Sequence, residues 1–273
     1  MTLNIKGKLF DLSSPIVMGI INLTSDSFYK GSRTDENSLL EKAGKMIDEG
    51  AKILDLGAYS TRPGAADIPV DLEIQRIESA VAILKKHYPD TILSVDTFRS
   101  EIAERSLKLG ADIINDVSGG DADEKMWDVI KAKNAPYIIM HMRGTPQTMT
   151  SLTDYENVTK EVFYSLAEKV KNLRESGVSD LIIDPGFGFA KTLEQNYEML
   201  KNLAYFKEIG VPLLVGVSRK SMIHKPLGIN ADSALNGTTA INMVALERGA
   251  KILRVHDVKE AVECVKLFNL INT

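Results

Sequence analysis

The sequence predicts an α/β fold: a (β/α)8 TIM barrel that takes in residues 1–273 as a single domain and begins with a short hairpin. Its length of 273 residues is close to the roughly 250 that are typical of such barrels. Eight short apolar runs, rich in β-branched residues, alternate with amphipathic stretches along the chain. An open, doubly wound sheet is the alternative, but eight strands in simple alternation favour a closed barrel.

The first element is the hairpin, which we expect to lie within residues 3–12, to turn around Gly7 and to close the bottom of the barrel. The apolar runs that follow are nearly continuous, as expected for strands that are buried on both faces. We expect strands over residues 16–21, 52–56, 91–95, 112–114, 137–140, 181–183, 212–217 and 251–255.

Helices are expected between these strands. Residues 37–49, for example, place apolar side chains on one stripe of a helix. A glycine follows several of the helical stretches and directly precedes the next strand, where it can adopt the left-handed conformation that ends a helix. These glycines are Gly50, Gly110, Gly177, Gly210 and Gly249.

The composition is that of an ordinary globular protein, with 44% hydrophobic and 26% charged residues. A net charge of −4 and a pI of about 5.7 leave no basic stripe for nucleic acid or for an anionic membrane. Cys264 is the only cysteine, so an intrachain disulfide is impossible. Neither a signal peptide nor an apolar run of about 18 residues is present, and we expect a cytoplasmic location.

Polar side chains stand at the carboxyl ends of the predicted strands, where barrel active sites lie. Nearly every strand contributes one, which predicts a pocket lined from all sides. These residues are Asn22, Asp96, Asn115, His141, Asp184, Ser218, Lys220, Arg254 and His256.

Three of these residues, Asp96, Asn115 and Asp184, are acceptors that suit a flat heterocycle with an amino-pyrimidinone edge. The glycines and phenylalanines of residues 186–189 let backbone approach such a ligand and could wall a ring. For each aspartate the alternative is a cap at the start of the following helix.

Barrel closure would bring Asn22 beside Arg254 and His256, which together would make an anion site. Arg254 could instead pair with a carboxylate on a helix. Residues 218–221 open a helix, where free N–H groups and the mobile charge of Lys220 favour a carboxylate; a solvated basic cap is the alternative. His141 is expected to line the pocket.

Two polar loops, residues 22–32 and 60–65, are longer than a minimal turn and suit mobile lids. The four histidines have no zinc-type spacing.

With these loops and strand ends, the sequence resembles the dihydropteroate synthase family over nearly its whole length. Seven motifs in family order carry the resemblance. They lie at residues 22–28, 60–64, 94–97, 114–120, 184–189, 218–221 and 254–258.

The resemblance implies a transferase of alkyl groups other than methyl, acting in folate biosynthesis. Such an enzyme condenses (7,8-dihydropterin-6-yl)methyl diphosphate with 4-aminobenzoate, through a cationic pterin, to give 7,8-dihydropteroate and diphosphate. It further implies a Mg2+ cofactor, a homodimer and a target of sulfonamides.

The resemblance also assigns roles to residues. The pterin would bind Asp96, Asn115, Asp184 and Lys220, with Arg254 over the ring. Diphosphate would bind Asn22, Arg254 and His256, with Asn22 as a ligand to Mg2+. The 4-aminobenzoate would lie by Phe28, Thr61, Arg62, Pro63 and Ser221. The catalytic residues would be Asp96, Lys220 and Asp26.

The chain departs from the family pattern at Ser25, Lys30, Ala58 and Tyr59, which bears on the loops and not on the reaction. Two other functions are possible for this barrel. A pterin-dependent methyltransferase would not need residues 60–63 for an aminobenzoate. A non-catalytic pterin-binding module would be expected to lose the diphosphate residues, which this chain keeps.

Overall fold

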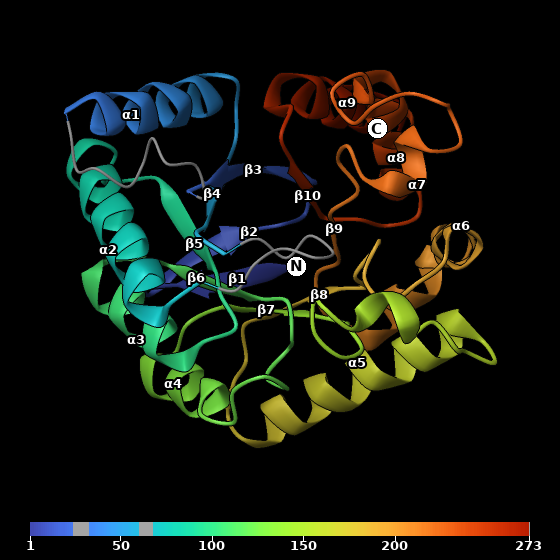
Figure 1. Ribbon diagram of the computed structural model, residues 1–273, viewed down its shortest axis with the longest axis horizontal. Coiled ribbons are helices and arrows are strands. Elements are labelled where there is room, and N and C mark those ends of the chain that lie inside the picture. Colours follow the sequence, from blue (N-terminus) through green and yellow to red (C-terminus); the bar gives the residue numbers. More distant parts are fainter. Residues whose placement is uncertain (24–32, 60–67, 273) are drawn as a thin grey trace.

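The computed structural model describes residues 1–23, 33–59 and 68–272, and the fold is a parallel barrel inside a ring of helices (Figure 1). The barrel strands are β3 (Ile16–Asn22), β4 (Ile53–Gly57), β5 (Ile92–Asp96), β6 (Ile113–Asp116), β7 (Tyr137–Met140), β8 (Leu181–Asp184), β9 (Leu214–Val215) and β10 (Ile252–Val255).

The helices of the described part surround these strands in chain order (Figure 1). They are α1 (Arg33–Asp48), α2 (Val70–His87), α3 (Ser100–Leu109), α4 (Met126–Lys133), α5 (Val158–Glu175), α6 (Leu193–Lys201), α7 (Ser221–His224), α8 (Leu235–Glu247) and α9 (Val258–Ile271). In the described ranges, the connections also contain the 3-10 helices Met149–Ser151 and Leu203–Ile209.

The strands are hydrogen-bonded in the order β8-β7-β6-β5-β4-β3-β10-β9. A parallel bridge between Ile183 and Leu213, with Ile183 N donating to Pro212 O at 3.0 Å, joins β8 to the segment that leads into β9. The predicted closed barrel is therefore confirmed. The seventh strand is shorter than expected, because only Leu214 and Val215 pair with β10.

The predicted hairpin is also confirmed, with β1 (Thr2–Ile5) pairing antiparallel to β2 (Lys8–Asp11). Lys6 and Gly7 both have positive φ, 50° and 84°, as a two-residue hairpin turn requires. Leu3, Ile5 and Leu12 pack with inward side chains from the barrel strands, so the hairpin seals one end of the barrel.

The inward residues at this apolar end show which side chains point into the barrel further along each strand. The inward residues that contact the hairpin cluster include Ile53 on β4, Ile113 on β6 and Ile182 on β8. Because successive side chains on a strand alternate in direction, the residue two positions later faces inward as well. Asp55, Asn115 and Asp184 therefore form a second, polar layer inside the barrel.

The helix ends follow the predicted glycine pattern, and all five glycines have positive φ. Gly110, for example, ends α3 in the left-handed conformation, and its N–H donates to the carbonyls of Leu107 and Ser106. Among the described residues, no helix is both long enough and apolar enough to cross a membrane.

Candidate active site

The centre of the site is Arg254, which reaches from β10 to two carboxylates on neighbouring strands. Its Nε donates to Asp55 Oδ2 at 2.6 Å, and its Nη2 donates to Asp96 Oδ2 at 2.6 Å. The carboxylates come from strands β4 and β5 and not from a helix, so the predicted alternative partner for Arg254 is wrong. Closure of the barrel, which pairs Arg254 with Met18 of β3, makes this reach possible.

Asp55 is the principal site residue that the sequence analysis missed. Its side chain is fully buried, and Oδ2 also accepts from Asn115 Nδ2 at 3.1 Å. The sequence contains an indication of this role, because Asp55 is a charged residue in an otherwise apolar strand. It lies two positions after the inward-facing Ile53 and therefore faces inward as well. A carboxylate at such a position needs a buried partner, and Arg254 is that partner.

Asp96 has an unusual protonation equilibrium. Burial raises its pKa from 3.8 to about 7; the positive charge of Arg254 opposes this shift, and the negative charge of Asp55 adds to it. For Arg254 itself burial disfavours the charge, but the carboxylates of Asp55 and Asp96 outweigh burial and raise its pKa. Arg254 is thus a permanent cation beside a carboxyl group that titrates near neutral pH.

Asp184 lies at the end of β8 and is buried, and its Oδ1 accepts from Gly186 N at 2.8 Å. Burial raises the pKa of Asp184, and the charge of Lys220 opposes the rise. Gly186 is required here, because it has a φ of 72° and a Cβ would lie 2.1 Å from the carbonyl oxygen of His141.

Lys220 points back to the turn that follows Asp184. Its Nζ donates to Phe187 O at 2.6 Å and lies 4.7 Å from the centroid of the Phe189 ring. Burial lowers the pKa of Lys220 to about 8. Lys220 is therefore directed into the barrel mouth and is not a solvated cap. Phe187, expected to face a ligand, packs into the hydrophobic core instead.

Neither predicted aspartate caps a helix. The N-cap of α3 is Arg99 and that of α6 is Thr192, so the capping alternatives for Asp96 and Asp184 are wrong. Both carboxylates remain available to the barrel mouth.

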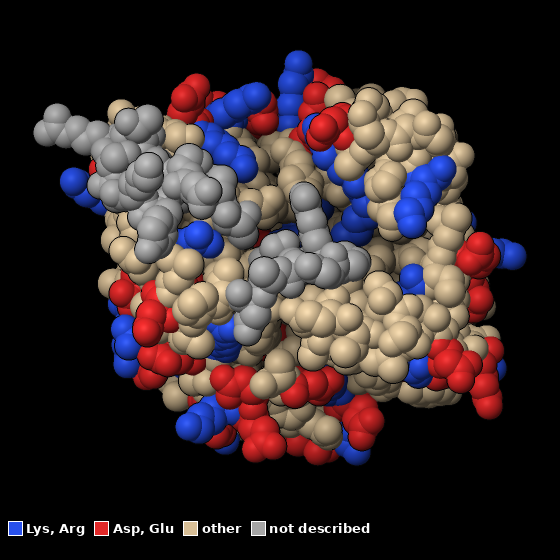
Figure 2. Space-filling model, in the orientation of Figure 1, with Lys and Arg blue, Asp and Glu red and all other residues tan. Residues whose placement is uncertain are grey.

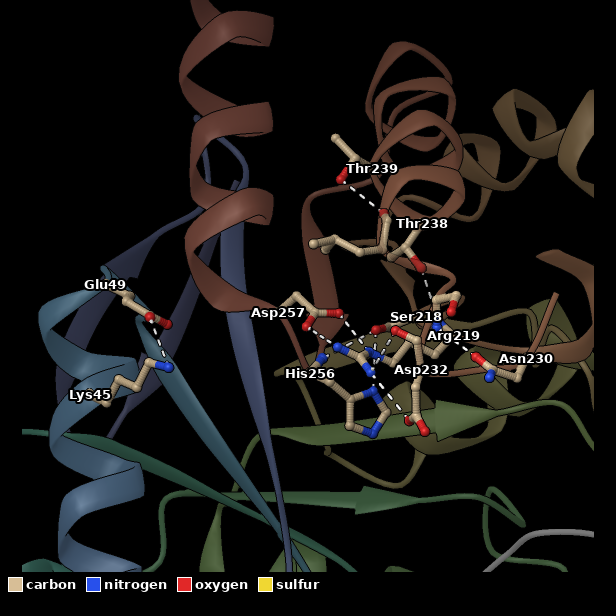
Figure 3. A network of polar contacts seen from close by, with 12 residues as sticks. Lys45, Glu49, Ser218, Arg219, Asn230, Asp232, Thr238, Thr239, His256 and Asp257 are labelled. Atoms are coloured by element: carbon tan, nitrogen blue, oxygen red, sulfur yellow. Dashed lines mark hydrogen bonds and ion pairs between the residues drawn. The ribbon is translucent and has the colours of Figure 1, made fainter. Parts of the chain in front are cut away.

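Hydrogen bonds and an ion pair join the segment after β9 to the residues that follow β10 (Figure 3). Arg219 makes a bidentate contact with Asp257, Nε to Oδ2 at 2.9 Å and Nη2 to Oδ1 at 2.6 Å. Its N–H, at a φ of 58°, donates to Thr238 Oγ1 at 3.1 Å. These contacts fix the backbone that leads into Lys220 and Ser221.

His256 follows β10 directly, and its Nδ1 lies 3.2 Å from Ser218 Oγ (Figure 3). Burial, reinforced by the charge of Arg254, lowers the pKa of His256 to about 4, so the ring is neutral at pH 7. A neutral imidazole can donate one hydrogen bond to an anion but adds no charge. Asn22 ends β3, where it pairs with Gly57, and is exposed.

Five predicted site residues lie outside the described residues: Asp26, Phe28, Thr61, Arg62 and Pro63. Ser221, the remaining predicted aminobenzoate residue, is the first residue of α7. Figure 2 shows Lys and Arg side chains around a hollow near the centre of one face, while most Asp and Glu side chains lie towards its periphery.

Comparison with known families identifies the class of protein to which this barrel belongs. The model of the family described as "Pterin binding enzyme" matches residues 18–256. The dihydropteroate synthase of Escherichia coli K12 is 40% identical over 272 residues, which cover 98% of this chain and 95% of that protein.

Solved structures agree with the sequence relatives. The Yersinia pestis dihydropteroate synthase in complex with a sulfonamide drug is 34% identical, covers 100% of this chain and 99% of its own, and has a TM-score of 0.92. The Xanthomonas albilineans enzyme with 7,8-dihydropteroate is 30% identical, covers 100% and 98%, and has a TM-score of 0.87. The chain belongs to the dihydropteroate synthase family of pterin-binding enzymes.

Proposed function

We propose that this protein is a transferase with dihydropteroate synthase activity in folate biosynthesis. It condenses (7,8-dihydropterin-6-yl)methyl diphosphate with 4-aminobenzoate to give 7,8-dihydropteroate and diphosphate, and residues 1–273 act as one domain. The observation that carries the proposal is the set of acceptors formed by the buried Asn115 and Asp184 and the largely buried Asp96, beside the cations Lys220 and Arg254.

The acceptors suit the pterin ring. Its amino and ring N–H groups need paired oxygen acceptors in a place without water, and buried carboxylates make the strongest such bonds. Asp184 and Asp96 would accept these hydrogen bonds, and the amide of Asn115 would complete the set. Arg254 would lie over the ring and remain charged throughout the reaction.

The diphosphate would leave from the side of β3 and β10. Arg254 and a neutral His256 would bind its oxygens, with Asn22 nearby. In the step itself the bond between the methylene carbon and the diphosphate oxygen breaks, and both electrons stay with the oxygen. The electron-rich pterin stabilises the positive carbon, and ionised Asp96 favours that charge. The aniline nitrogen of 4-aminobenzoate then forms the new bond and releases one proton.

Mg2+ is the metal that this chemistry would use, to neutralise charge on the diphosphate. Protein-bound Mg2+ commonly takes only one or two protein ligands and completes its shell with phosphate oxygens and water. The amide oxygen of Asn22 is a ligand of the right type. The described residues contain no group of three or more His, Cys, Asp or Glu that could hold a metal.

The 4-aminobenzoate would bind at Ser221, together with Phe28, Thr61, Arg62 and Pro63, and Asp26 would assist the cationic step. A sulfonamide, which mimics the aminobenzoate, is expected to compete with it.

We also propose a cytoplasmic homodimer. The exposed apolar residues Leu267, Leu270 and Ile271 of α9, spaced as one face of a helix, support a protein partner. Sedimentation velocity would measure the oligomeric state.

The test of the activity is a product assay. The purified protein is incubated with both substrates and Mg2+. Mass spectrometry quantifies 7,8-dihydropteroate, and a phosphate assay after hydrolysis by an added pyrophosphatase quantifies diphosphate. Stoichiometric formation of both products is expected. Binding of the pterin without any product would favour a non-catalytic module, and methyl transfer from a methylated pterin would favour the methyltransferase function.

A further inference from the structure

A second lysine lies behind the turn that carries Asp184. Lys191 directly follows this turn, residues 185–190, and precedes the N-cap of α6, Thr192; only 8% of Lys191 is exposed. Its Nζ donates to Phe189 O at 2.9 Å and to Gly186 O at 3.0 Å, and it lies 3.2 Å from His141 Nδ1. No carboxylate of the described residues forms an ion pair with it. The charge is stabilised by carbonyl dipoles and by an imidazole.

These contacts determine the state of His141. An ammonium group has only donors, so Nδ1 of His141 must accept and its ring proton must lie on Nε2. Burial lowers the pKa of His141 to about 2, and the charge of Lys191 adds to the effect, which keeps the ring neutral. The backbone of His141 also donates to Asp184 O at 3.0 Å. Lys191 thereby ties the end of β7 to the turn after β8.

The same turn holds both polar groups that the proposed pterin site needs. Gly186, whose carbonyl binds Lys191, donates its N–H to Asp184 Oδ1. Phe187, the next residue, accepts from Lys220. Displacing the carbonyls of Gly186 and Phe189 would therefore move Asp184 and Lys220 together. The positive charge of Lys191 also favours the ionised form of Asp184.

We infer that Lys191 is a positioning residue for pterin binding: through the turn of residues 185–190 it aims the Asp184 carboxylate. The inference rests on the proposed function. Lys191 would not touch the substrate, and its action would pass through Gly186 and Phe189.

Lys191 also makes the site sensitive to pH. Burial lowers its pKa to about 7; the charge of Asp184 opposes the shift, and the charges of Lys220 and Arg143 reinforce it. The neutral His141 is the other titratable group in contact. The ammonium form, which has three donors and a charge, prevails below about pH 7. Pterin affinity should therefore decline as the pH rises from 7 to 9, and the loss of charge from Lys220, whose pKa is about 8, should add to the upper part of this decline.

The experiment compares Lys191→Met, Lys191→Arg and Lys85→Met with the wild type. Lys85 is a matched control because it is also a partly buried lysine, donating to Thr91 O and Asp112, but at the end of the barrel sealed by the hairpin. Calorimetry measures the affinity for 6-hydroxymethyl-7,8-dihydropterin from pH 6 to 9. Steady-state kinetics give kcat and the KM for 4-aminobenzoate, and urea unfolding gives the stability.

We expect Lys191→Met to weaken pterin binding at pH 6.5 by roughly tenfold or more, about 1.4 kcal/mol. It should leave the KM for 4-aminobenzoate within about threefold and should make the decline above pH 7 less steep, leaving the part that comes from Lys220. Lys191→Arg should restore part of the affinity and remain charged at pH 9. Lys85→Met should lose stability and keep the wild-type affinity.

A Lys191→Met protein that binds the pterin within twofold of a catalytically active wild type would overturn the inference. So would an equal loss of affinity in Lys85→Met. If the methionine variant does not fold, the arginine variant decides by its pH profile, since a decline identical to the wild type's would exclude Lys191 as its source. A wild type that binds pterin but forms no product would instead refute the proposed function.

Discussion

The Asp55→Asn substitution tests whether the second buried carboxylate holds Arg254 in place. Asp55 Oδ2 accepts from Arg254 Nε at 2.6 Å and from Asn115 Nδ2 at 3.1 Å. In the wild type the single oxygen Oδ2 accepts from both donors, so an asparagine can keep these bonds only without their charge. Its NH2 group would take the place of Oδ1, a buried atom with no hydrogen-bond partner among the described residues. A charge-assisted hydrogen bond contributes about 1.5–3 kcal/mol, and breaking a whole buried ion pair costs about 3–5 kcal/mol.

Because Arg254 keeps its bond to Asp96, we expect the smaller of these effects. The free energy of unfolding should fall by about 2 kcal/mol. If the guanidinium also leaves the place that we propose for it over the pterin, kcat/KM should fall roughly 30-fold, which is the same energy on the transition-state scale.

The substitution should also change the pH dependence, through Asp96. The pKa of Asp96 is raised to about 7, and the charge of Asp55 contributes to that rise. A group whose pKa is raised by folding stabilises the folded state below its unfolded pKa. That stability is lost as the pH rises through the folded pKa, here between 3.8 and about 7. Without the charge of Asp55, both this loss and the onset of pterin binding should move to lower pH.

Ser94→Ala is the control for this experiment. Ser94 lies beside Asp55 in the register of β4 and β5, and its buried Oγ has no hydrogen-bond partner among the described residues. The alanine should therefore change neither stability nor affinity appreciably. Urea unfolding at pH 7, and pterin titrations from pH 5 to 8, measure both variants. If Asp55→Asn matches Ser94→Ala in stability and in the pH of half-maximal binding, Asp55 does not position Arg254.

Three further outcomes are expected. Asp184→Ala should abolish pterin binding in calorimetry while the circular dichroism spectrum stays native, and unchanged affinity would remove Asp184 from the site. Arg219→Lys cannot keep the bidentate contact with Asp257, so kcat/KM should fall by roughly tenfold, about 1.4 kcal/mol; wild-type kinetics would show that this contact does not position Lys220. Tyr137→Phe removes the 2.6 Å hydrogen bond to the buried carboxylate of Asp116 and should lower the unfolding free energy by about 1–3 kcal/mol in urea, whereas an unchanged midpoint would contradict this.

Most of the fold could be predicted from the sequence because its signals are local. Eight apolar runs identify the strands, and glycines such as Gly110 identify helix ends from a conformation that few other residues adopt. Closure could also be predicted, because eight strands in simple alternation favour a closed barrel. Closure brings Arg254 on the last strand beside β3 and within reach of the strands that follow β3. The number of predicted strands is therefore enough to predict this long-range contact.

The contacts inside the mouth could not be predicted in the same way. Asp55 and Lys191 have partners 199 and 50 residues away in the chain, and no local pattern identifies such partners. Parity could have shown that Asp55 faces inward, but not that it shares Arg254 with Asp96. Phe187 was placed at the ligand because aromatic residues near glycines suit a ring, whereas packing directs it into the core.

The charges in the mouth explain why this site should bind a ligand rich in N–H groups. Three carboxyl groups, the buried ones of Asp55 and Asp184 and the largely buried one of Asp96, face two cations, Lys220 and Arg254, so one negative charge has no cation of its own. Without a ligand, burial and then the negative charge of Asp55 raise the pKa of Asp96 to about 7, so that this carboxyl group can hold a proton near neutral pH. A pterin ring would bring donors to the same oxygens and make that proton unnecessary. The unpaired negative charge that destabilises the ligand-free barrel would therefore favour binding of the pterin. The same negative charge would stabilise the methylene cation that forms when the diphosphate leaves.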